Sequence, residues 1–379
     1  MNEIPLEDED DAWAREEAEE ARKEARRAEP LPQISPEEFA SWRSPRTVSG
    51  GPVSLDNPLW HWLVRTGLDA HFANEKFHGP SSFGEGPMWC FDRIGQSVTE
   101  LPDGRRVHVG GEHEDFYDPD FFIYNDVVVI DPDGGIRILG YGREQFPPTD
   151  FHSASRIGNT LYLVGGLGYE AQRQVGVTPV FALDLEQMSI RALATQGEAP
   201  GWISKHAAEL APDARTLVVT GGRIWRGKGL SLQQNIDRWS LNVDTGRWER
   251  LTALDWQRWT MLPVDRKYHR LLDVRHELFA RDYGLGDWRH AEPPDFEALA
   301  ELYRIDDGAP LPQKGQAHNE YIAEVDGIRV RFTEESRAVK ALVEGRLPQD
   351  RLEAFQRKTL ATLERLNASP WEIETDTAA

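Results

Sequence analysis

Three short segments decide the fold: Val107-His108-Val109-Gly110-Gly111, Leu161-Tyr162-Leu163-Val164-Gly165-Gly166 and Leu217-Val218-Val219-Thr220-Gly221-Gly222. Each is an apolar, β-branched run that ends in a glycine pair, and such runs favour β-strands. The spacing between glycine pairs is 55 residues (110 to 165) and then 56 residues (165 to 221). A nearly fixed period in this range indicates repeated structural units. The sequence therefore predicts a mainly β protein built around three copies of one unit.

Other features keep the same phase as the glycine pairs. His152 lies 13 residues before Gly165, and His206 lies 15 residues before Gly221. Each pair is followed by two further strand-like runs, which are 127–131 and 136–138, 180–184 and 190–193, and 239–242 and 247–251. In these features the chain resembles the kelch family of β-propellers. A kelch blade has four antiparallel strands, a double glycine at the end of the second, and an apolar anchor such as Trp248 in the last.

The resemblance covers roughly residues 87–251 and implies a kelch-type β-propeller with three clear blades. One glycine of each pair allows a sharp turn with positive φ, and the other leaves space where strands crowd together. Closed propellers usually have four to eight blades. Three alternatives stay open: degenerate extra blades in the flanking segments, an incomplete, open propeller, or a homodimer that completes the ring. Residues 259–281 are the candidate for a degenerate blade, although a helix fits them equally well.

We divide the chain into five parts on these grounds. Ser35-Pro36 and Asn57-Pro58 each predict a capped helix start. The parts are an acidic helical extension and linker (1–49), a helical lead-in (50–86), three kelch repeats (87–251), a degenerate blade or helical connector (252–316), and a small α+β module (317–379).

The C-terminal module has its own local signals. Residues 320–325 and 328–333 flank Asp326-Gly327, a dipeptide typical of two-residue hairpin turns. Residues 338–344 predict a third strand, and 349–366 have the pattern of an amphipathic helix. The segment Trp371-Glu372-Ile373 predicts a last strand.

Composition and charge exclude several classes of function. The formal net charge is −21, and residues 1–29 contribute twelve acidic and five basic side chains, or −7, to it. This balance argues against nucleic acid or an anionic membrane as the partner and favours a basic protein, although it also fits simple solubility. The single cysteine, Cys90, excludes an intrachain disulfide. We find no long apolar run and no basic leader, so we expect a cytoplasmic protein.

The loops after the glycine pairs hold the candidate binding residues, because loops on a rigid scaffold commonly carry function. A metal site in the acidic first loop, beside His108, is disfavoured because its spacing matches no ligand template. Packing against a neighbouring blade is an equal alternative for Trp225. The candidate partner-binding residues are Glu112, His113, Asp115, Tyr117, Asp118, Tyr169, Arg173, Arg223, Trp225 and Arg226.

Catalytic motifs are absent from the sequence. We find no phosphate-binding loop, dinucleotide fingerprint, nucleophile elbow or zinc spacing. His152 and His206 recur at one repeat position, which favours a packing or hydrogen-bonding role over general base catalysis. Cys90 is most simply a small buried apolar residue. We therefore predict no catalytic residue, no metal and no cofactor.

We expect a protein–protein interaction scaffold rather than an enzyme. One version is an immunity or antitoxin-like protein that binds a basic bacterial toxin, and the ratio of 35 Arg to 8 Lys fits a bacterial origin. The alternative is an enzyme that acts on a sugar or small polar metabolite, because some kelch propellers resemble sugar isomerases. Arg223, Glu112 and His113 would then converge on the channel. The copper oxidases with this fold need a tyrosine–cysteine cross-link that Cys90 does not supply.

Overall fold

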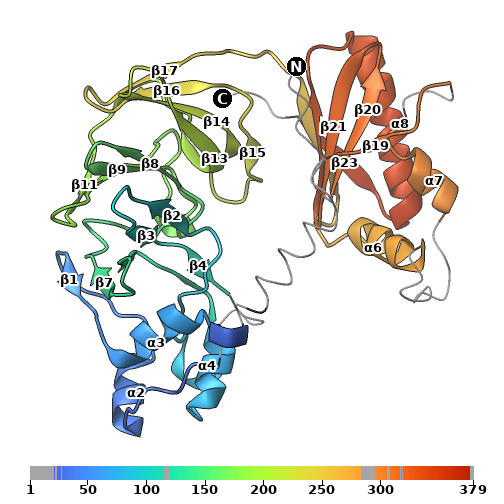
Figure 1. The fold of residues 1–379 in the computed structure, drawn as a ribbon. Helices are drawn as coiled ribbons and strands as arrows, with labels where there is room; N and C mark the ends of the chain where they lie inside the picture. Colours follow the sequence, from blue (N-terminus) through green and yellow to red (C-terminus); the bar gives the residue numbers. More distant parts are fainter. Residues whose placement is uncertain are drawn as a thin grey trace. The chain divides into compact units, whose positions relative to one another are not determined.

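The computed structural model describes residues 21, 24–26, 28–114, 120–282, 295–304, 308–315, 317 and 319–375. The chain divides into two compact units, Met1–Ala253 and Leu254–Ala379, and each is described by itself. Both units are built mainly from antiparallel sheets (Figure 1). Over the part of the chain described, no helix is both long and apolar enough to cross a bilayer.

Short helices precede the first sheet. The predicted caps are confirmed, because Ser35 Oγ accepts a hydrogen bond from Glu38 N at 3.1 Å and Asn57 Oδ1 accepts one from Trp60 N at 2.9 Å. Most of the predicted acidic helix over residues 10–27 lies outside the described residues. The helices are α2 (Pro36–Trp42), α3 (Pro58–Thr66), α4 (Ala70–Lys76) and α5 (Ser82–Glu85).

Each glycine-pair repeat folds into one antiparallel sheet, as predicted. We call them sheets 1, 2 and 3 (Figure 1). Sheet 1 contains β2 (Ser97–Glu100), β3 (Arg106–Val109), β6 (Val127–Ile130) and β7 (Ile136–Gly140), with β1 (Val53–Ser54) at the β7 edge. Sheet 2 contains β8 (Ser153–Ile157), β9 (Thr160–Val164), β10 (Val180–Asp184) and β11 (Ile190–Ala192). Sheet 3 contains β13 (Trp202–Leu210), β14 (Thr216–Trp225), β16 (Trp239–Asn242) and β17 (Arg247–Arg250), with β12 (Gln196–Gly197) and β15 (Gln233–Gln234) at its margins.

Sheet 2 is packed on both faces. On β9, Leu161 and Leu163 belong to the core shared with sheet 1, whereas Tyr162 and Val164 belong to the core shared with sheet 3. This division follows from the two-residue alternation of side chains along a strand. The first strands of the three sheets also lie side by side, since β8 contacts both β2 and β13. The three sheets therefore form a continuous stack.

The two ends of the stack differ. At sheet 1, Val128 and Ile138 share a core with Leu59, Trp60 and other residues of the N-terminal helices. At sheet 3, Leu217 and Val219 face sheet 2, whereas the alternate positions include Thr220, Asn242, Arg247 and Glu249. A polar outer face is what the terminal unit of a stacked array needs in water.

The glycine pairs make the contacts between neighbouring sheets. Gly111 N donates to Thr149 O at 2.8 Å, and Gly166 N donates to Ile203 O at 2.8 Å. A Cβ on Gly110 would lie 2.3 Å from Thr149 O, and one on Gly165 would lie 2.3 Å from Ile203 O. A Cβ on Gly221 would meet nothing within 4 Å. The first two pairs therefore need glycine because the backbone of the next sheet approaches them closely. Within the residues described, no further sheet approaches the glycine pair of sheet 3 in this way.

The repeated histidines bind across the same boundaries. His152 Nε2 lies 2.8 Å from Ser97 Oγ, and His206 Nε2 lies 2.9 Å from Ser153 Oγ. Burial lowers the pKa of His152 to about 3 and that of His206 to about 4, so both rings are neutral near pH 7. The predicted hydrogen-bonding role of these histidines is confirmed. In sheet 3 the residue after the histidine is Ala207, which has no hydroxyl to offer a further sheet.

The second unit is one six-stranded antiparallel sheet with the order β19-β20-β21-β22-β18-β23. The predicted hairpin is confirmed, because Val325 pairs with Ile328 on either side of Asp326-Gly327. The third strand, the long helix and the last strand also form where expected. The elements are β18 (Arg258–Pro263), α6 (Leu271–Asp282), α7 (Phe296–Glu301), β19 (Gln313–Lys314), β20 (Glu320–Val325), β21 (Ile328–Glu335), β22 (Ala338–Val343), α8 (Gln349–Asn367) and β23 (Trp371–Thr375).

Residues 259–281 differ from the degenerate blade that the sequence allowed. Trp259 and Met261 lie on β18, which pairs with β22 and β23, and α6 follows. The reason is packing: both side chains enter the core of the second unit together with Phe332 and Phe355. This segment therefore completes the C-terminal sheet and supplies no fourth sheet to the stack.

Glu334 anchors α6 and the end of α7 to the sheet of the second unit. Its side chain is fully buried and pairs with Arg275 at 2.7 Å. Tyr303 Oη donates to the same carboxylate at 2.8 Å. A buried charge is tolerated because it is paired and hydrogen-bonded.

The glycine contacts predict a difference between two otherwise similar substitutions. Gly165 and Gly221 both have left-handed φ values, 68° and 62°, so an alanine at either site carries a similar backbone penalty. Only Gly165→Ala also drives a Cβ into a carbonyl. We expect Gly165→Ala to lower the free energy of unfolding by about 1–3 kcal/mol more than Gly221→Ala, as overpacking typically does. Urea unfolding of the two variants measures this, and equal losses would contradict the role assigned to the contact.

Candidate functional site

The candidate binding residues lie on the loops that follow the second strand of each sheet. Three of them, Asp115, Tyr117 and Asp118, lie outside the described residues. Glu112 and His113 form β4 (Glu112–His113), which pairs with β5 (Phe122–Ile123) in the sheet 1 loop. Tyr169 and Arg173 flank the short helix η2 (Glu170–Gln172) in the sheet 2 loop. The rest belong to sheet 3.

Glu112 is held in place by its backbone. Its N–H donates to Ile94 O at 2.8 Å, and its carbonyl accepts from Ile94 N at 2.9 Å. The side chains of β4 alternate, so His113 is buried while Glu112 stays partly exposed. The sheet 1 loop therefore presents one carboxyl group in a defined direction.

That carboxyl group meets Asp150, which sequence reasoning missed. Asp150 is fully buried, and its Oδ1 accepts a hydrogen bond from Gly168 N at 2.6 Å. Among the described residues, no N–H or hydroxyl donor reaches its Oδ2. Burial first, and then the charge of Asp150, raise the pKa of Glu112 to about 7.

Charged groups from all three sheets surround this carboxyl pair. Glu114 in the sheet 1 loop also raises the pKa of Glu112, whereas Lys205 of sheet 3 lowers it. Burial is the main cause that raises the pKa of Asp150, and Arg173 of the sheet 2 loop opposes it. The convergence of Arg223, Glu112 and His113 on a channel stays a prediction. Sequence reasoning did not include Asp150 and Lys205, whose charges act on the pKa of Glu112.

The backbone beside the pair takes unusual conformations. Phe151 and Lys205 have φ values of 51° and 56°, a region that non-glycine residues rarely adopt. Lys205 N donates to Phe151 O at 2.9 Å, and Phe151 N donates to Gly95 O at 2.8 Å. Lys205 Nζ also lies 4.1 Å from the centre of the Phe151 ring. These contacts link Gly95, which precedes β2, and Phe151, which precedes β8, to Lys205 on β13.

Tyr169 and Arg173 brace the loops. Tyr169 Oη accepts a hydrogen bond from Ile123 N at 2.9 Å, which ties the sheet 2 loop to β5. Arg173 donates to Leu167 O at 3.0 Å and to Gly168 O at 2.9 Å. Both side chains therefore have intramolecular roles within the predicted binding face.

The three candidate residues of sheet 3, Arg223, Trp225 and Arg226, differ in how far they are buried. Trp225 is only 8% exposed and lies opposite Trp202 of the same sheet. Packing of Trp225 against a neighbouring blade stays a prediction. Arg223 lies between Ser204 and Gln234 in neighbouring strands, and both Arg223 and Arg226 are partly buried. Of these three predicted residues, the two arginines present the larger accessible fraction.

An exposed apolar patch lies on the loops of sheets 2 and 3, and sequence reasoning missed it. Val175, Val177 and Leu230 are 63%, 44% and 45% exposed. A Cβ on Gly227 would lie 3.9 Å from Val175 Cγ2 and 3.8 Å from Leu230 Cδ1, so the two loops meet there. The sequence gives little indication of this patch, because an isolated valine or leucine in a glycine-rich loop can be either buried or exposed. We call these three side chains the loop patch.

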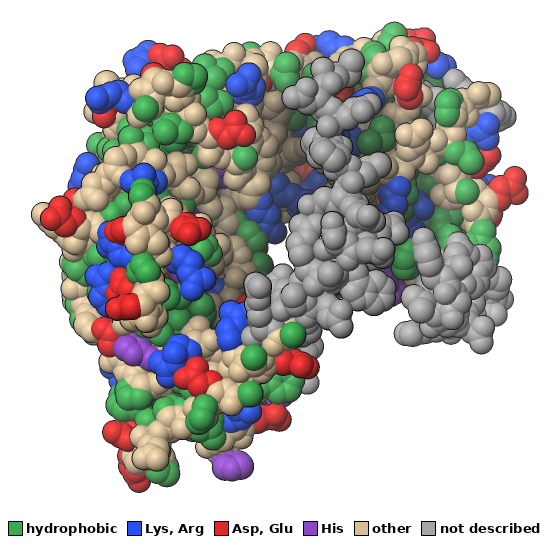
Figure 2. All heavy atoms as spheres, viewed as in Figure 1, with side chains coloured by type: hydrophobic (Ala, Val, Ile, Leu, Met, Phe, Trp, Pro, Cys, Tyr) green, Lys and Arg blue, Asp and Glu red, His purple; other side chains and the backbone are tan. Residues whose placement is uncertain are grey.

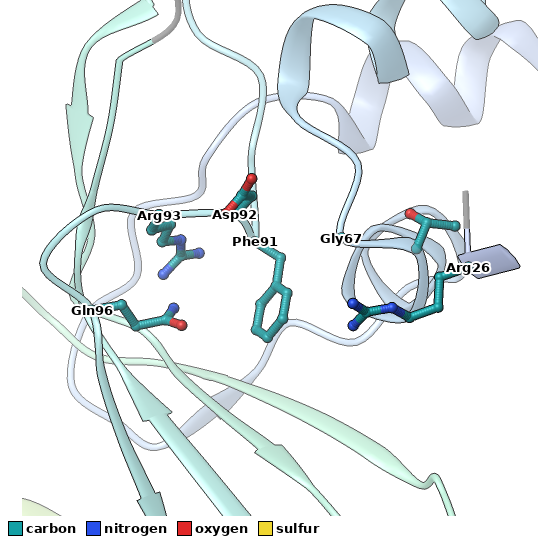
Figure 3. A pocket seen from close by; sticks show the side chains of 7 residues that line it. Arg26, Gly67, Phe91, Asp92, Arg93 and Gln96 are labelled. Carbon is teal, nitrogen blue, oxygen red and sulfur yellow. The ribbon is translucent and has the colours of Figure 1, made fainter. Parts of the chain in front are cut away.

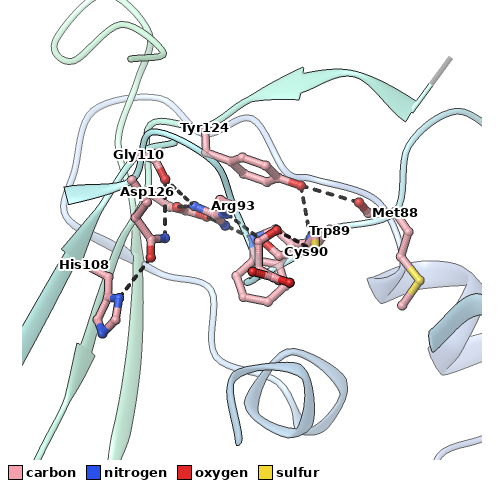
Figure 4. A network of polar contacts seen from close by, with 10 residues as sticks. Met88, Trp89, Cys90, Arg93, His108, Gly110, Tyr124 and Asp126 are labelled. Atoms are coloured by element: carbon pink, nitrogen blue, oxygen red, sulfur yellow. Dashed lines mark hydrogen bonds and ion pairs between the residues drawn. The ribbon is translucent and has the colours of Figure 1, made fainter. Parts of the chain in front are cut away.

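A buried polar network supports the sheet 1 loop from beneath (Figure 4). The guanidinium of Arg93 pairs with Asp126, donates to Gly110 O at 3.0 Å, and lies 3.4 Å from the centre of the Tyr124 ring. Trp89 Nε1 donates to Asp126 Oδ2 at 2.9 Å. Cys90 is buried, as expected, and its N–H donates to Tyr124 Oη at 3.0 Å. This network fixes Gly110 of the first glycine pair against the segment of residues 89–93, which precedes β2.

A hollow of about 300 Å³ lies beside residues 91–96, which precede β2 (Figure 3). It is at the lower end of the range for ligand pockets. Arg93, one of its lining residues, is already paired with Asp126. No cluster of three or more histidine, cysteine, aspartate or glutamate side chains suited to a metal occurs among the described residues. The residues that line the hollow are Arg26, Thr66, Gly67, Phe91, Asp92, Arg93 and Gln96.

No family model matches the chain, and no curated protein matches it. The structure of YjhT is similar with a TM-score of 0.34 and 14% identity, over 65% of this chain and 64% of that chain. The structure of a novel fungal alcohol oxidase of the AA5 family, in complex with copper, has a TM-score of 0.28 and 12% identity, over 42% of this chain and 44% of that chain. The chain spans less than two thirds of either neighbour, and likenesses this weak carry no argument about function.

The Tyr169 brace generates a prediction. Tyr169→Phe removes the acceptor of the buried Ile123 N–H, and an unsatisfied buried donor costs about 1–3 kcal/mol. We expect lower stability in urea and faster hydrogen exchange at the Ile123 amide. The control is Tyr268→Phe, because Tyr268 is 68% exposed in the second unit. Unchanged exchange at Ile123 would show that the brace contributes nothing.

Proposed function

We propose that this protein is a protein–protein interaction scaffold. Sheets 1, 2 and 3 would be three blades of an incomplete kelch-type β-propeller, and the loops after the glycine pairs would bind the partner. The loop patch of Val175, Val177 and Leu230 carries the proposal. Val175 and Leu230 meet beside Gly227, and exposed apolar side chains that lie together mark interaction sites. The apolar cores between sheets 1 and 2 and between sheets 2 and 3 support a scaffold role. They bury the faces of the sheets, so the loops are the parts that can bind a partner.

The bracing of the loops supports the same function. Trp202 Nε1 donates to Leu167 O at 2.9 Å, and Tyr169 and Arg173 hold the same loop to its neighbours. A loop that is already ordered loses little conformational entropy when it binds. The scaffold would therefore recognise its partner with a preformed surface.

The charge pattern narrows the chemistry of the partner. The loop patch adjoins Arg226 and Lys228 in sequence, so the local rim is basic, although the whole chain has a net charge of −21. Over the sheets of the first unit, acidic and basic side chains alternate in small groups (Figure 2). A partner with an apolar anchor, some acidic contacts and a basic overall charge fits this surface, because long-range attraction speeds encounter.

One specific version is an immunity or antitoxin-like protein that neutralises a basic bacterial toxin in the cytoplasm. Its support is the negative net charge together with the preformed loops. Glu112, Tyr169, Arg173, Arg223 and Arg226 would lie around the loop patch in this role. A homodimer that completes the propeller stays a prediction for the same fold, and the polar outer face of sheet 3 disfavours it.

The test is a pull-down with the tagged full chain from its native lysate, followed by mass spectrometry and affinity measurement with the purified partner. The variant is Val175→Asp with Leu230→Asp, which places charges in the loop patch. The control is Leu210→Asp, since Leu210 is 44% exposed on β13, outside the patch. We expect a stoichiometric partner whose affinity falls at least tenfold in the patch variant only.

Two results would contradict the proposal. A partner retained equally by all three proteins would place the interface elsewhere. Recovery of no partner would favour the alternative, an enzyme that acts on a sugar or small polar metabolite, and a thermal-shift screen with such compounds would follow.

A further inference from the structure

One histidine side chain crosses each boundary of the stack. At the boundary of sheets 1 and 2, His152 Nε2 lies 2.8 Å from Ser97 Oγ. At the boundary of sheets 2 and 3, His206 Nε2 lies 2.9 Å from Ser153 Oγ. The Nδ1 atom of each ring is buried and has no hydrogen-bond partner among the described residues. Each ring is thus bound through one nitrogen, and that nitrogen binds the neighbouring sheet.

This arrangement suits a neutral imidazole and not an imidazolium. A neutral ring has one N–H donor and one bare nitrogen, whereas a protonated ring has two N–H donors. Protonation would therefore place a charged N–H donor at the buried Nδ1, where no described residue accepts a hydrogen bond. A buried charge without a partner is costly. The ring consequently takes up a second proton readily only when its boundary opens and water reaches it.

No described carboxylate offsets this cost. Burial lowers the pKa of His152 to about 3 and that of His206 to about 4, and the charge of His206 also lowers the pKa of His152. Asp150 is buried just before β8, but its charge does not act on either pKa. The strands around the two rings, which are β2, β8, β13 and β14, carry their charged side chains at exposed or partly exposed positions. These side chains are Glu100, Arg156, Lys205, Glu209 and Arg223.

We propose that His152 and His206 are acid-sensitive clasps, which hold the stack closed near neutral pH and release its boundaries in an acidic medium. When a boundary opens, its histidine takes up a proton from water, and the ring returns to the buried position only after it loses that proton. The loop patch spans the second boundary, because Val175 belongs to the sheet 2 loop and Leu230 to the sheet 3 loop. Acid therefore also separates the two halves of the loop patch. The clasps concern the free chain and do not depend on the proposed binding role.

The direction of the effect follows from proton uptake. The closed state holds the pKa of the rings at about 3 and about 4, whereas the open state returns it to the ordinary value of 6.5. The clasps therefore contribute fully above the ordinary value, lose strength as the pH falls through it, and change no further below the closed-state values. From these values, the opening constant of each boundary rises about thirtyfold between pH 7.5 and pH 5.

Hydrogen exchange of the full chain at several pH values tests the proposal. The reporters are two amides that donate across the boundaries, Gly111 N to Thr149 O at the first and Gly166 N to Ile203 O at the second. We expect the protection of both amides, corrected for the intrinsic pH dependence of exchange, to fall about thirtyfold between pH 7.5 and pH 5. In the same samples, NMR of the histidine rings should show both clasps still neutral at pH 5 in the closed stack.

Matched variants separate the two clasps from each other. His206→Gln keeps an amide group that can bind Ser153 but cannot take up a proton. The protection of Gly166 should therefore lose its pH dependence, while that of Gly111 keeps it. His152→Gln should give the reverse pattern.

A third variant controls for general effects of pH. His71→Gln changes an exposed histidine on α4 and should behave like the natural protein. Equal pH dependence of both amides in all the variants, or clasps that are protonated at pH 5 in the closed stack, would overturn the proposal. Should a clasp variant fail to fold, the ring measurement on the natural protein still decides, because it needs no substitution.

Discussion

The close approach of each glycine pair to the next sheet is the constraint on which the first unit depends. Gly111 N donates to Thr149 O, just before β8, and Gly166 N donates to Ile203 O on β13. At both contacts a Cβ on the preceding glycine would clash with the acceptor carbonyl. These two hydrogen bonds set the spacing of the sheets, and the apolar faces of sheet 2 then fill the space on both sides. The neutral histidines add a side-chain hydrogen bond at each boundary, where a charged ring would carry a desolvation cost.

The same constraint explains why the stack has two different ends. The N-terminal helices cover sheet 1 with large aromatic side chains, including the Trp60–Trp89 stack at 4.5 Å. Sheet 3 ends the series with a polar face, and its histidine is followed by Ala207 where sheet 2 has Ser153. The glycines of the third pair still adopt positive φ values, and Gly222 would clash with His206 if it had a Cβ. The third pair therefore requires glycine for a reason within sheet 3 itself, although it makes no contact of this kind with a further sheet among the described residues.

The stacking of the sheets brings charged side chains from different sheets close together at the candidate site. Glu112, Asp150, Lys205 and Arg173 lie in segments of different sheets, yet their charges act on one another. The prediction that the loops after the glycine pairs matter named Glu112 and Arg173 but not Asp150 or Lys205. Asp150 precedes β8 and Lys205 lies within β13, so neither belongs to those loops. The loop patch was also missed, since the exposure of Val175 and Leu230 depends on how two loops meet.

The sequence by itself determined the elements whose causes are local. The period of the glycine pairs predicted three antiparallel sheets, Ser35 and Asn57 predicted helix starts, and Asp326-Gly327 predicted a hairpin. Only the tertiary structure decided where β18 belongs, because an apolar strand carries no record of its partners. Trp259 of β18 is buried in the core of the second unit. It also decided the environment of Glu112. The charge of Asp150, 38 positions away in the sequence (112 to 150), raises the pKa of Glu112 because the packing of neighbouring sheets removes water from both carboxyl groups.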